Sequence, residues 1–310
     1  MDSMKHKNFL QCIFVITLML CGACARQTPP PFEIAAPAPD AATVEPTPLP
    51  SATATALPTQ TFTPAPTSTP AATPTPFITR PASGESVAIP ILMYHHLKYR
   101  DANASQVLRT WSVAPNEFAA QLDYFQQRGF HTITFKQLVE FFDDGAPLPT
   151  NPILLTFDDG WIDSYTVAFP ELKKRGMVGN FFVPTQYLDV GGELLINWEQ
   201  AIEMDRAGME FGGHTISHED LTKITLEQMR RQLSDAKFKM EEKLGHPTYA
   251  LSYPFGAFNP KVVAETQGAG YRAALILCCG YKLSDDILLT LPRIRISYDD
   301  TIEEIARKLP

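Results

Sequence analysis

Two adjacent carboxylates, Asp158 and Asp159, directly follow the apolar run 153–157, and Gly160 comes next. The run is short, with β-branched or aromatic residues at its ends, which is typical of a buried strand. Side by side at the mouth of such a strand, the two carboxylates repel each other, and burial raises the cost of ionising both. A divalent cation would remove this cost. One aspartate could ligate the metal while the other, pointing the opposite way, holds the attacking water.

Two histidines, His214 and His218, follow another apolar run that ends at Gly213. If this segment turns helically, the spacing of four residues places both imidazoles on one face, which is a common metal-ligand arrangement. The same spacing also occurs in polar surface turns. Together with an aspartate, however, two histidines leave an open position on Zn²⁺, as catalytic sites do.

The elements that position these residues alternate along the chain. Expected strands cover 87–94, 130–134, 152–157, 179–183, 209–213, 248–254, 271–277 and 293–297, and expected helices cover 116–129, 163–176, 197–208 and 225–245. Alternating strands and helices predict a parallel sheet, and seven or eight such units favour a barrel. Barrel chemistry lies on loops at the carboxyl ends of strands, where the aspartates and histidines fall.

The motifs TFDDG (156–160) and HTISH (214–218) resemble the first two motifs of the polysaccharide deacetylases, the NodB-homology domains of carbohydrate esterase family 4. The resemblance implies an α/β fold, a distorted (β/α)7-type barrel, as a single catalytic domain over 87–310. It implies that Asp158 is the catalytic base and that Asp159, His214 and His218 are metal ligands. The implied cofactor is a divalent metal ion, with Zn²⁺ favoured and Co²⁺ or Ni²⁺ as alternatives.

The third family motif is matched only in part, by SYPFG at 252–256. The resemblance assigns the turn to Pro254 and Gly256, with Tyr253 as a further supporting residue, and an oxyanion-hole donor to the amide of Phe255. The motif's arginine, which orients the base in the family, is replaced by Ser252.

Two arginines near the end of a later strand, Arg293 and Arg295, are candidates for the missing role. An ordinary surface position is an equally good interpretation of either.

The family's general acid is a histidine near the C-terminus, but no histidine follows His246. The early segment ILMYHHL (91–97) resembles the subgroup that deacetylates extracellular poly-β-1,6-N-acetylglucosamine, in which this histidine comes from the first strand. Residue alternation sends His95 and His96 to opposite faces, so only one can point into the site. We favour His95 as the acid; the alternative is that both only pack or cap.

Residues 1–86 indicate that the protein is exported from the cytoplasm. Residues 1–25 have the layout of a secretory signal, with a cut after Ala25 or lipid attachment at Cys24 as alternatives to an uncleaved anchor. Residues 26–86 form a Pro/Thr/Ala-rich stalk that cannot bury a core. The net charge of −8, without a basic block, argues against nucleic acid. We expect an extracytoplasmic monomer that is secreted or anchored to the bacterial cell surface and meets the membrane only through its N-terminus.

These features predict a metal-dependent hydrolase that removes N-acetyl groups from an extracellular N-acetylglucosamine polymer, with poly-β-1,6-N-acetylglucosamine favoured. Alternative substrates are peptidoglycan, chitin oligomers and acetylated xylan. A catalytically silent, metal-containing carbohydrate-binding domain is a further alternative, favoured by the missing arginine and opposed by the presence of Asp158.

Overall fold

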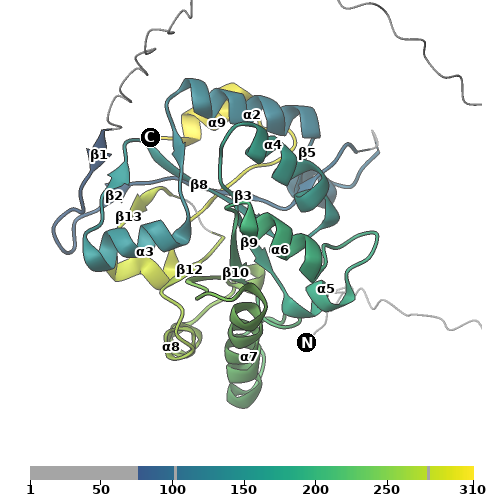
Figure 1. Ribbon diagram of the computed structural model, residues 1–310, viewed down its shortest axis with the longest axis vertical. Helices are drawn as coiled ribbons and strands as arrows, with labels where there is room; N and C mark the ends of the chain where they lie inside the picture. The colour runs from purple at the N-terminus through teal and green to yellow at the C-terminus, as the bar shows by residue number, and fades with distance from the viewer. Residues whose placement is uncertain (1–75, 101–102, 278–279) are drawn as a thin grey trace, which may run out of the picture. The chain divides into compact units, whose positions relative to one another are not determined.

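The computed structural model describes residues 76–100, 103–277 and 280–310 (Figure 1). The predicted signal segment and the stalk up to residue 75 lie outside these residues. Within them, no helix is long and apolar enough to cross a membrane.

A parallel sheet forms the centre of the domain. Its strands follow the order β12-β11-β10-β9-β8-β3-β14, and β6 also pairs with β8. The bounds are β3 (Ile91–Tyr94), β6 (His131–Thr132), β8 (Pro152–Asp158), β9 (Asn180–Val183), β10 (Glu210–Gly213), β11 (Ala250–Ser252), β12 (Ala273–Leu275) and β14 (Ile294–Arg295). Every pair in this sheet is parallel, as the alternating pattern predicted.

The two edges of the sheet meet through the segment that leads into β14. Leu291 forms a parallel bridge with Leu275 of β12, and its amide donates to the carbonyl of Ala274 at 2.8 Å. Three residues further on, β14 pairs with β3, where Ile294 lies opposite Leu92. The sheet therefore curls into a barrel, which confirms the predicted fold class.

Helices surround the sheet (Figure 1). They are α1 (Gln106–Thr110), α2 (Pro115–Gln127), α3 (Phe135–Asp144), α4 (Phe169–Lys174), α5 (Thr185–Val190), α6 (Trp198–Arg206), α7 (Leu226–Leu244), α8 (Pro260–Gly268) and α9 (Ile302–Lys308). The expected helix at 225–245 is α7, which begins at a capping box of Thr225 and Gln228 and ends at the left-handed Gly245. The expected helix at 163–176 is divided into the π-helical turn η1 (Ser164–Ala168) and α4, at a point where Pro170 has no N–H to donate. Helices α1, α3, α5, α8 and α9 were not predicted.

Short elements complete the domain. The expected strand at 87–94 is interrupted at Ile89 and Pro90, so that β2 (Val87–Ala88) pairs with β13 (Lys282–Leu283) instead of joining β3. Strand β4 (His96–Leu97) pairs in parallel with β5 (Ser112–Val113). Two 3₁₀ turns, η2 (Pro254–Gly256) and η3 (Asp285–Thr290), also belong to the domain.

The contacts of the domain begin before residue 87. Strand β1 (Phe77–Ile78) pairs antiparallel with β7 (Leu148–Pro149). The Arg80 side chain donates to the carbonyl of Phe142, and the Ser83 hydroxyl donates to Asp285 Oδ2 at 2.6 Å. Residues 76–86, which we had assigned to the stalk, therefore contact the barrel.

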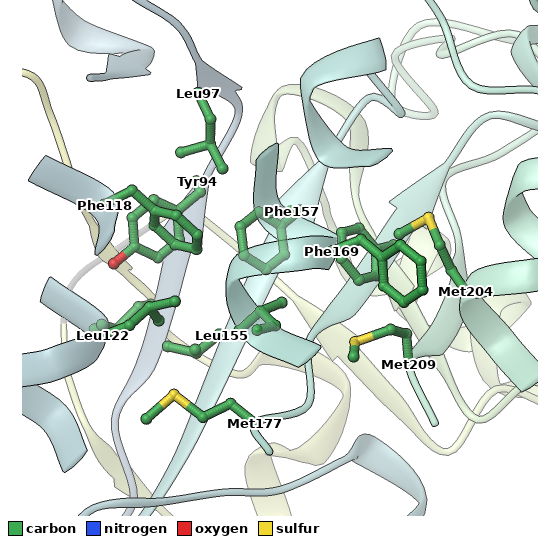
Figure 2. Close-up of a cluster of buried hydrophobic side chains, with 14 of the residues drawn as sticks. Tyr94, Leu97, Phe118, Leu122, Leu155, Phe157, Phe169, Met177, Met204 and Met209 are labelled. Atoms are coloured by element: carbon green, nitrogen blue, oxygen red, sulfur yellow. The ribbon is translucent and has the colours of Figure 1, made fainter. Parts of the chain in front are cut away.

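The strands that lead to the site are anchored by buried aromatic side chains (Figure 2). Every residue of β8 is buried, as expected for a parallel strand covered on both faces. Phe157 stacks on Tyr94 of β3 and on Phe181 of β9, with ring centroids 5.3 and 4.8 Å apart. Since such stacked pairs fix neighbouring strands against one another, the carboxyl end of β8 has a defined position relative to those of β3 and β9.

Candidate active site

The carboxyl ends of β3, β8, β10 and β11 surround a cavity of about 350 Å³. Its lining brings together most of the residues singled out from the sequence. The lining residues are His95, His96, Val107, Leu108, Trp111, Asp158, Asp159, Trp161, His214, His218, Tyr253, Phe255 and Leu277.

The turn after β8 directs Asp159 toward the two histidines. Asp159 has φ 74° and Gly160 has φ 72°. A Cβ on Gly160 would lie 2.3 Å from Val183, so only glycine fits this turn. The Trp161 indole donates to Asp159 Oδ2 at 3.1 Å, which leaves Oδ1 facing the histidines. Asp159 Oδ1 is buried and has no hydrogen-bond partner.

Asp159, His214 and His218 converge as predicted. Asp159 Oδ1 lies 3.3 Å from His214 Nε2 and 3.4 Å from His218 Nε2. One ligand atom from each residue lies within 4.8 Å of the others. This is the spacing of three ligands around one small ion, and an orphaned buried carboxylate oxygen needs such a partner.

The two histidines meet through a turn and not through the helical segment we had expected. Thr215 and His218 have φ 66° and 61°, values that an α-helix excludes. The Gln232 side chain of α7 accepts from the amides of Ile216 and Ser217 and so holds this turn. His214 Nδ1 lies 2.6 Å from the carbonyl of Ser252, which fixes its proton there and leaves Nε2 free to ligate.

Burial and mutual interactions shift the pKa values of all three residues. Burial alone would raise the pKa of Asp159, but the adjacent His214 imidazole outweighs it and holds the pKa well below its usual range. Burial lowers the pKa of His214, but the adjacent Asp159 carboxylate outweighs this and raises it. Burial and the neighbouring His214 lower the pKa of His218 to about 4, which keeps its imidazole neutral at pH 7. One carboxylate and two imidazoles fit Zn²⁺, and Co²⁺ or Ni²⁺ also accept these donors.

Arg293 holds the other aspartate, Asp158, in a bidentate ion pair. The Arg293 guanidinium donates to Asp158 Oδ1 at 2.9 Å and to Oδ2 at 2.8 Å, and both side chains are buried. The Ser252 hydroxyl lies 3.0 Å from Asp158 Oδ2 and 3.0 Å from Arg293 Nη2. Burial raises the pKa of Asp158, but the charge of Arg293 outweighs it and keeps the pKa below its usual value. The family's motif would place an arginine at position 252, where this chain has Ser252. Arg293, from the segment that closes the barrel, contacts the Asp158 carboxylate instead.

Arg295, the other candidate arginine, lies elsewhere. Its side chain is exposed, and its guanidinium carbon lies 5.2 Å from the centre of the Trp111 ring. Of the two candidates, the structure places only Arg293 beside Asp158.

Both early histidines line the cavity, contrary to the expectation from strand alternation. His95 lies in the break between β3 and β4, so the alternation does not continue through it. The rings of His95 and Trp111 are 4.5 Å apart, while His96 lies 4.2 Å from Trp161. Burial lowers the pKa of His95, against the carboxylates of the site, which raise it.

The SYPFG segment forms a tight turn at the cavity rim. Phe255 has φ 59°, and its side chain is 61% exposed and lies 4.6 Å from the His218 ring. Pro254 is buried, and the buried Tyr253 donates its hydroxyl to the carbonyl of Leu289 at 3.1 Å. Tyr253 and Pro254 therefore fix the turn that carries the Phe255 amide.

Sequence reasoning missed several lining and supporting residues. Trp111 packs on His95, and the buried Asp163 lies 3.3 Å from His96 Nδ1. Asp163 could have been noticed as a third carboxylate five residues after Asp158, whereas Trp111 and the neighbouring Val107 and Leu108 carry no such signal.

Residues 145–274 match the family described as polysaccharide deacetylase. The chain is 29% identical over 209 residues to YxkH of Bacillus subtilis, named as a candidate polysaccharide deacetylase, covering 67% of this chain and 71% of that protein. The structure is similar to that of the Streptococcus pyogenes deacetylase PplD in complex with acetate, with a TM-score of 0.67, 28% identity, and coverage of 73% of this chain and 99% of that one. Residues 145–274 therefore match the polysaccharide deacetylase family, and the similar proteins over most of the domain are named as deacetylases.

The comparisons do not single out one polymer. The poly-β-1,6-N-acetyl-D-glucosamine N-deacetylase of Escherichia coli is 23% identical over 242 residues, covering 65% of this chain and 36% of that protein. Relatives named for peptidoglycan N-acetylmuramic acid and for chitin match at 30% and 28% identity over shorter stretches. The predicted family is supported by the match over residues 145–274, while the predicted subgroup has only the weak support of 23% identity.

Proposed function

We propose that this protein removes N-acetyl groups from an N-acetylglucosamine-containing polymer outside the cytoplasm, with a divalent metal ion held by Asp159, His214 and His218. The observation that carries the proposal is the buried, unpartnered Asp159 Oδ1, which faces Nε2 of both histidines. Beside it, both carboxylate oxygens of Asp158 accept hydrogen bonds from Arg293, so this carboxylate is not directed at the two histidines. This arrangement divides the two carboxylates between ligation and base chemistry.

When bound, the metal supplies a Lewis acid that polarises the acetamide carbonyl and makes water more acidic. The open side of the three ligands faces the cavity, which is where an acetamide and a water molecule would meet. Zn²⁺ is our preferred ion for this donor set, and Co²⁺ and Ni²⁺ remain alternatives.

The chain's own residues would move the protons and bind the developing charge. The Asp158 carboxylate takes the proton of the attacking water, while Arg293 and Ser252 hold its two oxygens in place. The Phe255 amide at the cavity rim donates to the carbonyl oxygen as negative charge develops on it. His95 then protonates the nitrogen as the C–N bond breaks, which releases acetate and leaves an amine on the sugar.

The position of Arg293 supports an enzyme over a silent carbohydrate-binding domain. The missing motif arginine was the feature that favoured a silent domain, and a metal-binding protein needs Asp159 but has no need of Asp158. An arginine bonded to both oxygens of a buried Asp158 is expected where that carboxylate must keep its charge and orientation.

For the substrate we keep an extracellular N-acetylglucosamine polymer, with peptidoglycan, chitin oligomers and acetylated xylan as alternatives to poly-β-1,6-N-acetylglucosamine. The N-terminal signal and stalk support a protein that is secreted or anchored at the bacterial cell surface, which we expect to be a monomer.

Acetate release from a panel of these polymers tests the proposal, with protein stripped by a chelator and then loaded with Zn²⁺, Co²⁺ or Ni²⁺. We expect metal-dependent release from at least one polymer. Asp158→Asn should keep the metal and lower turnover by about 10²–10⁴-fold. Asp144→Asn, at an exposed carboxylate of α3, is the matched control. Normal turnover in Asp158→Asn would remove that residue as the base.

A further inference from the structure

A second cavity, of about 720 Å³, lies beside the catalytic cavity and shares Leu277 with it. The carboxyl end of β14 forms part of its lining, and four charged residues face it: Arg293, Arg295, Asp300 and Lys308. A polymer that places one sugar in the catalytic cavity has room to place a neighbouring sugar here.

Three of these four charges are already matched. Arg293 is paired with Asp158 at 2.8 Å, and Lys308 Nζ lies 2.6 Å from Asp300 Oδ1. Among the residues that the structure describes, no carboxylate lies within ion-pair distance of Arg295. The second cavity therefore has one uncompensated positive charge, in a chain whose net charge is −8.

The position of Arg295 directs this charge toward the substrate side of the barrel. Arg295 is the last residue of β14, and Arg293 directly precedes that strand. Arg293 reaches Asp158 inside the barrel, whereas Arg295, one step closer to the mouth, is exposed and lies over Trp111. Trp111 itself lines the catalytic cavity. The guanidinium is thus held at the border of the two cavities.

We propose that Arg295 binds an acidic substituent, a carboxylate or a phosphate, on the sugar next to the one that is deacetylated, and so selects anionic glycans over neutral ones. A guanidinium forms two parallel hydrogen bonds to either anion, which gives both affinity and orientation. The inference rests on the proposed deacetylase function and names the class of substrate for that site.

The test measures kcat/KM for acetate release by the full-length protein on three probes. They are N-acetylchitotetraose, an alternating N-acetylglucosamine–N-acetylmuramic acid tetrasaccharide, and an N-acetylchitotetraose carrying a 6-phosphate. Arg295→Met keeps the apolar stem against Trp111 and removes the charge, and Arg295→Lys keeps the charge. Arg128→Met, at the exposed end of α2, is the matched control.

We expect Arg295→Met to lower the ratio of acidic to neutral kcat/KM by about fivefold, as for a partly exposed ion pair. Arg295→Lys should retain most of the ratio, and 0.5 M salt should reduce it in the wild type but not in Arg295→Met. A loss confined to the muramic acid probe identifies a carboxylate, and one confined to the phosphorylated probe identifies a phosphate.

The inference is overturned if the wild type does not prefer either acidic probe, or if Arg295→Met lowers kcat/KM equally on all three, as a purely structural role would. Absence of acetate release by the wild type from every probe, and from the wider polymer panel, would instead contradict the proposed function.

Discussion

Replacing Arg293 by methionine should destabilise the fold and inactivate the enzyme together. Arg293 is 1% exposed and Asp158 is 2% exposed, and the two side chains share two hydrogen bonds. Methionine fills much of the same volume but leaves the Asp158 carboxylate buried without its counter-charge. The Ser252 hydroxyl remains as a neutral donor, which cannot replace a guanidinium.

The magnitude follows from the burial of the pair. Removing one partner of a buried ion pair costs about 3–5 kcal/mol, because the other charge stays desolvated. The carbonyl of Ile276 also loses its bond from Arg293 Nε, which is 3.1 Å long. Since single domains are stable by about 5–15 kcal/mol, this loss is a large part of the free energy of unfolding. Turnover should fall by about 10²–10⁴-fold, because the base is no longer held in position.

Urea unfolding and acetate release per folded molecule measure the two effects. In the double variant Arg293→Met/Asp158→Asn the stranded charge is absent, so its free energy of unfolding should exceed that of Arg293→Met alone. The variant Ser252→Arg/Arg293→Met returns the arginine to the family's usual position. It should recover part of the turnover, because Ser252 already contacts Asp158. A loss below about 1 kcal/mol in Arg293→Met, or unchanged turnover, would refute the reasoning.

Four further predictions concern other parts of the molecule. His214→Ala should lower bound metal, measured by elemental analysis, and turnover in parallel, so full metal occupancy would exclude this ligand. His95→Ala should lower turnover by about 10²–10⁴-fold at unchanged metal content, and by less on an ester substrate; a larger loss in His96→Ala would reverse the assignment of the acid. A chain beginning at Val87 should melt at a lower temperature than one beginning at residue 76, because it lacks the β1–β7 pairing; equal melting temperatures would show that this pairing contributes nothing. Burial raises the pKa of Glu210 to about 7 from 4.5, so the folded state keeps a proton that the unfolded state releases, and the free energy of unfolding should fall as pH rises from 5 to 7. Glu210→Gln should remove this part of the slope in urea titrations, and an unchanged slope would assign it to other groups.

The alternation of apolar runs and amphipathic segments was sufficient to predict the parallel barrel. The apolar pattern of each strand lies within a few consecutive residues. Helices such as α7 likewise have their start and stop signals within their own segment. The interruption of the expected strand at 87–94 was less predictable. The run divides at Ile89 and Pro90 because β2 pairs with β13, which is distant in the sequence. The unpredicted helices are mostly short and depend on packing against the sheet more than on their own sequence.

The sequence by itself determined which residues form the candidate metal site. Asp159, His214 and His218 stand at the ends of apolar runs, and parallel strands bring such ends to one edge of the sheet. Their convergence therefore follows from local patterns plus one topological rule.

Only the tertiary structure decided which arginine supports Asp158 and which histidines reach the cavity. Arg293 lies 135 residues from Asp158 along the chain, and the two meet because the segment before β14 closes the barrel between β12 and β3. No local period distinguishes Arg293 from Arg295, since residues two apart in the expected strand at 293–297 would share one face, whereas β14 begins only at Ile294. In the same way, the break between β3 and β4 lets both His95 and His96 line the cavity. Local patterns fix the type and direction of an element, but the depth of each side chain in the barrel depends on closure and register, which are set by distant parts of the chain.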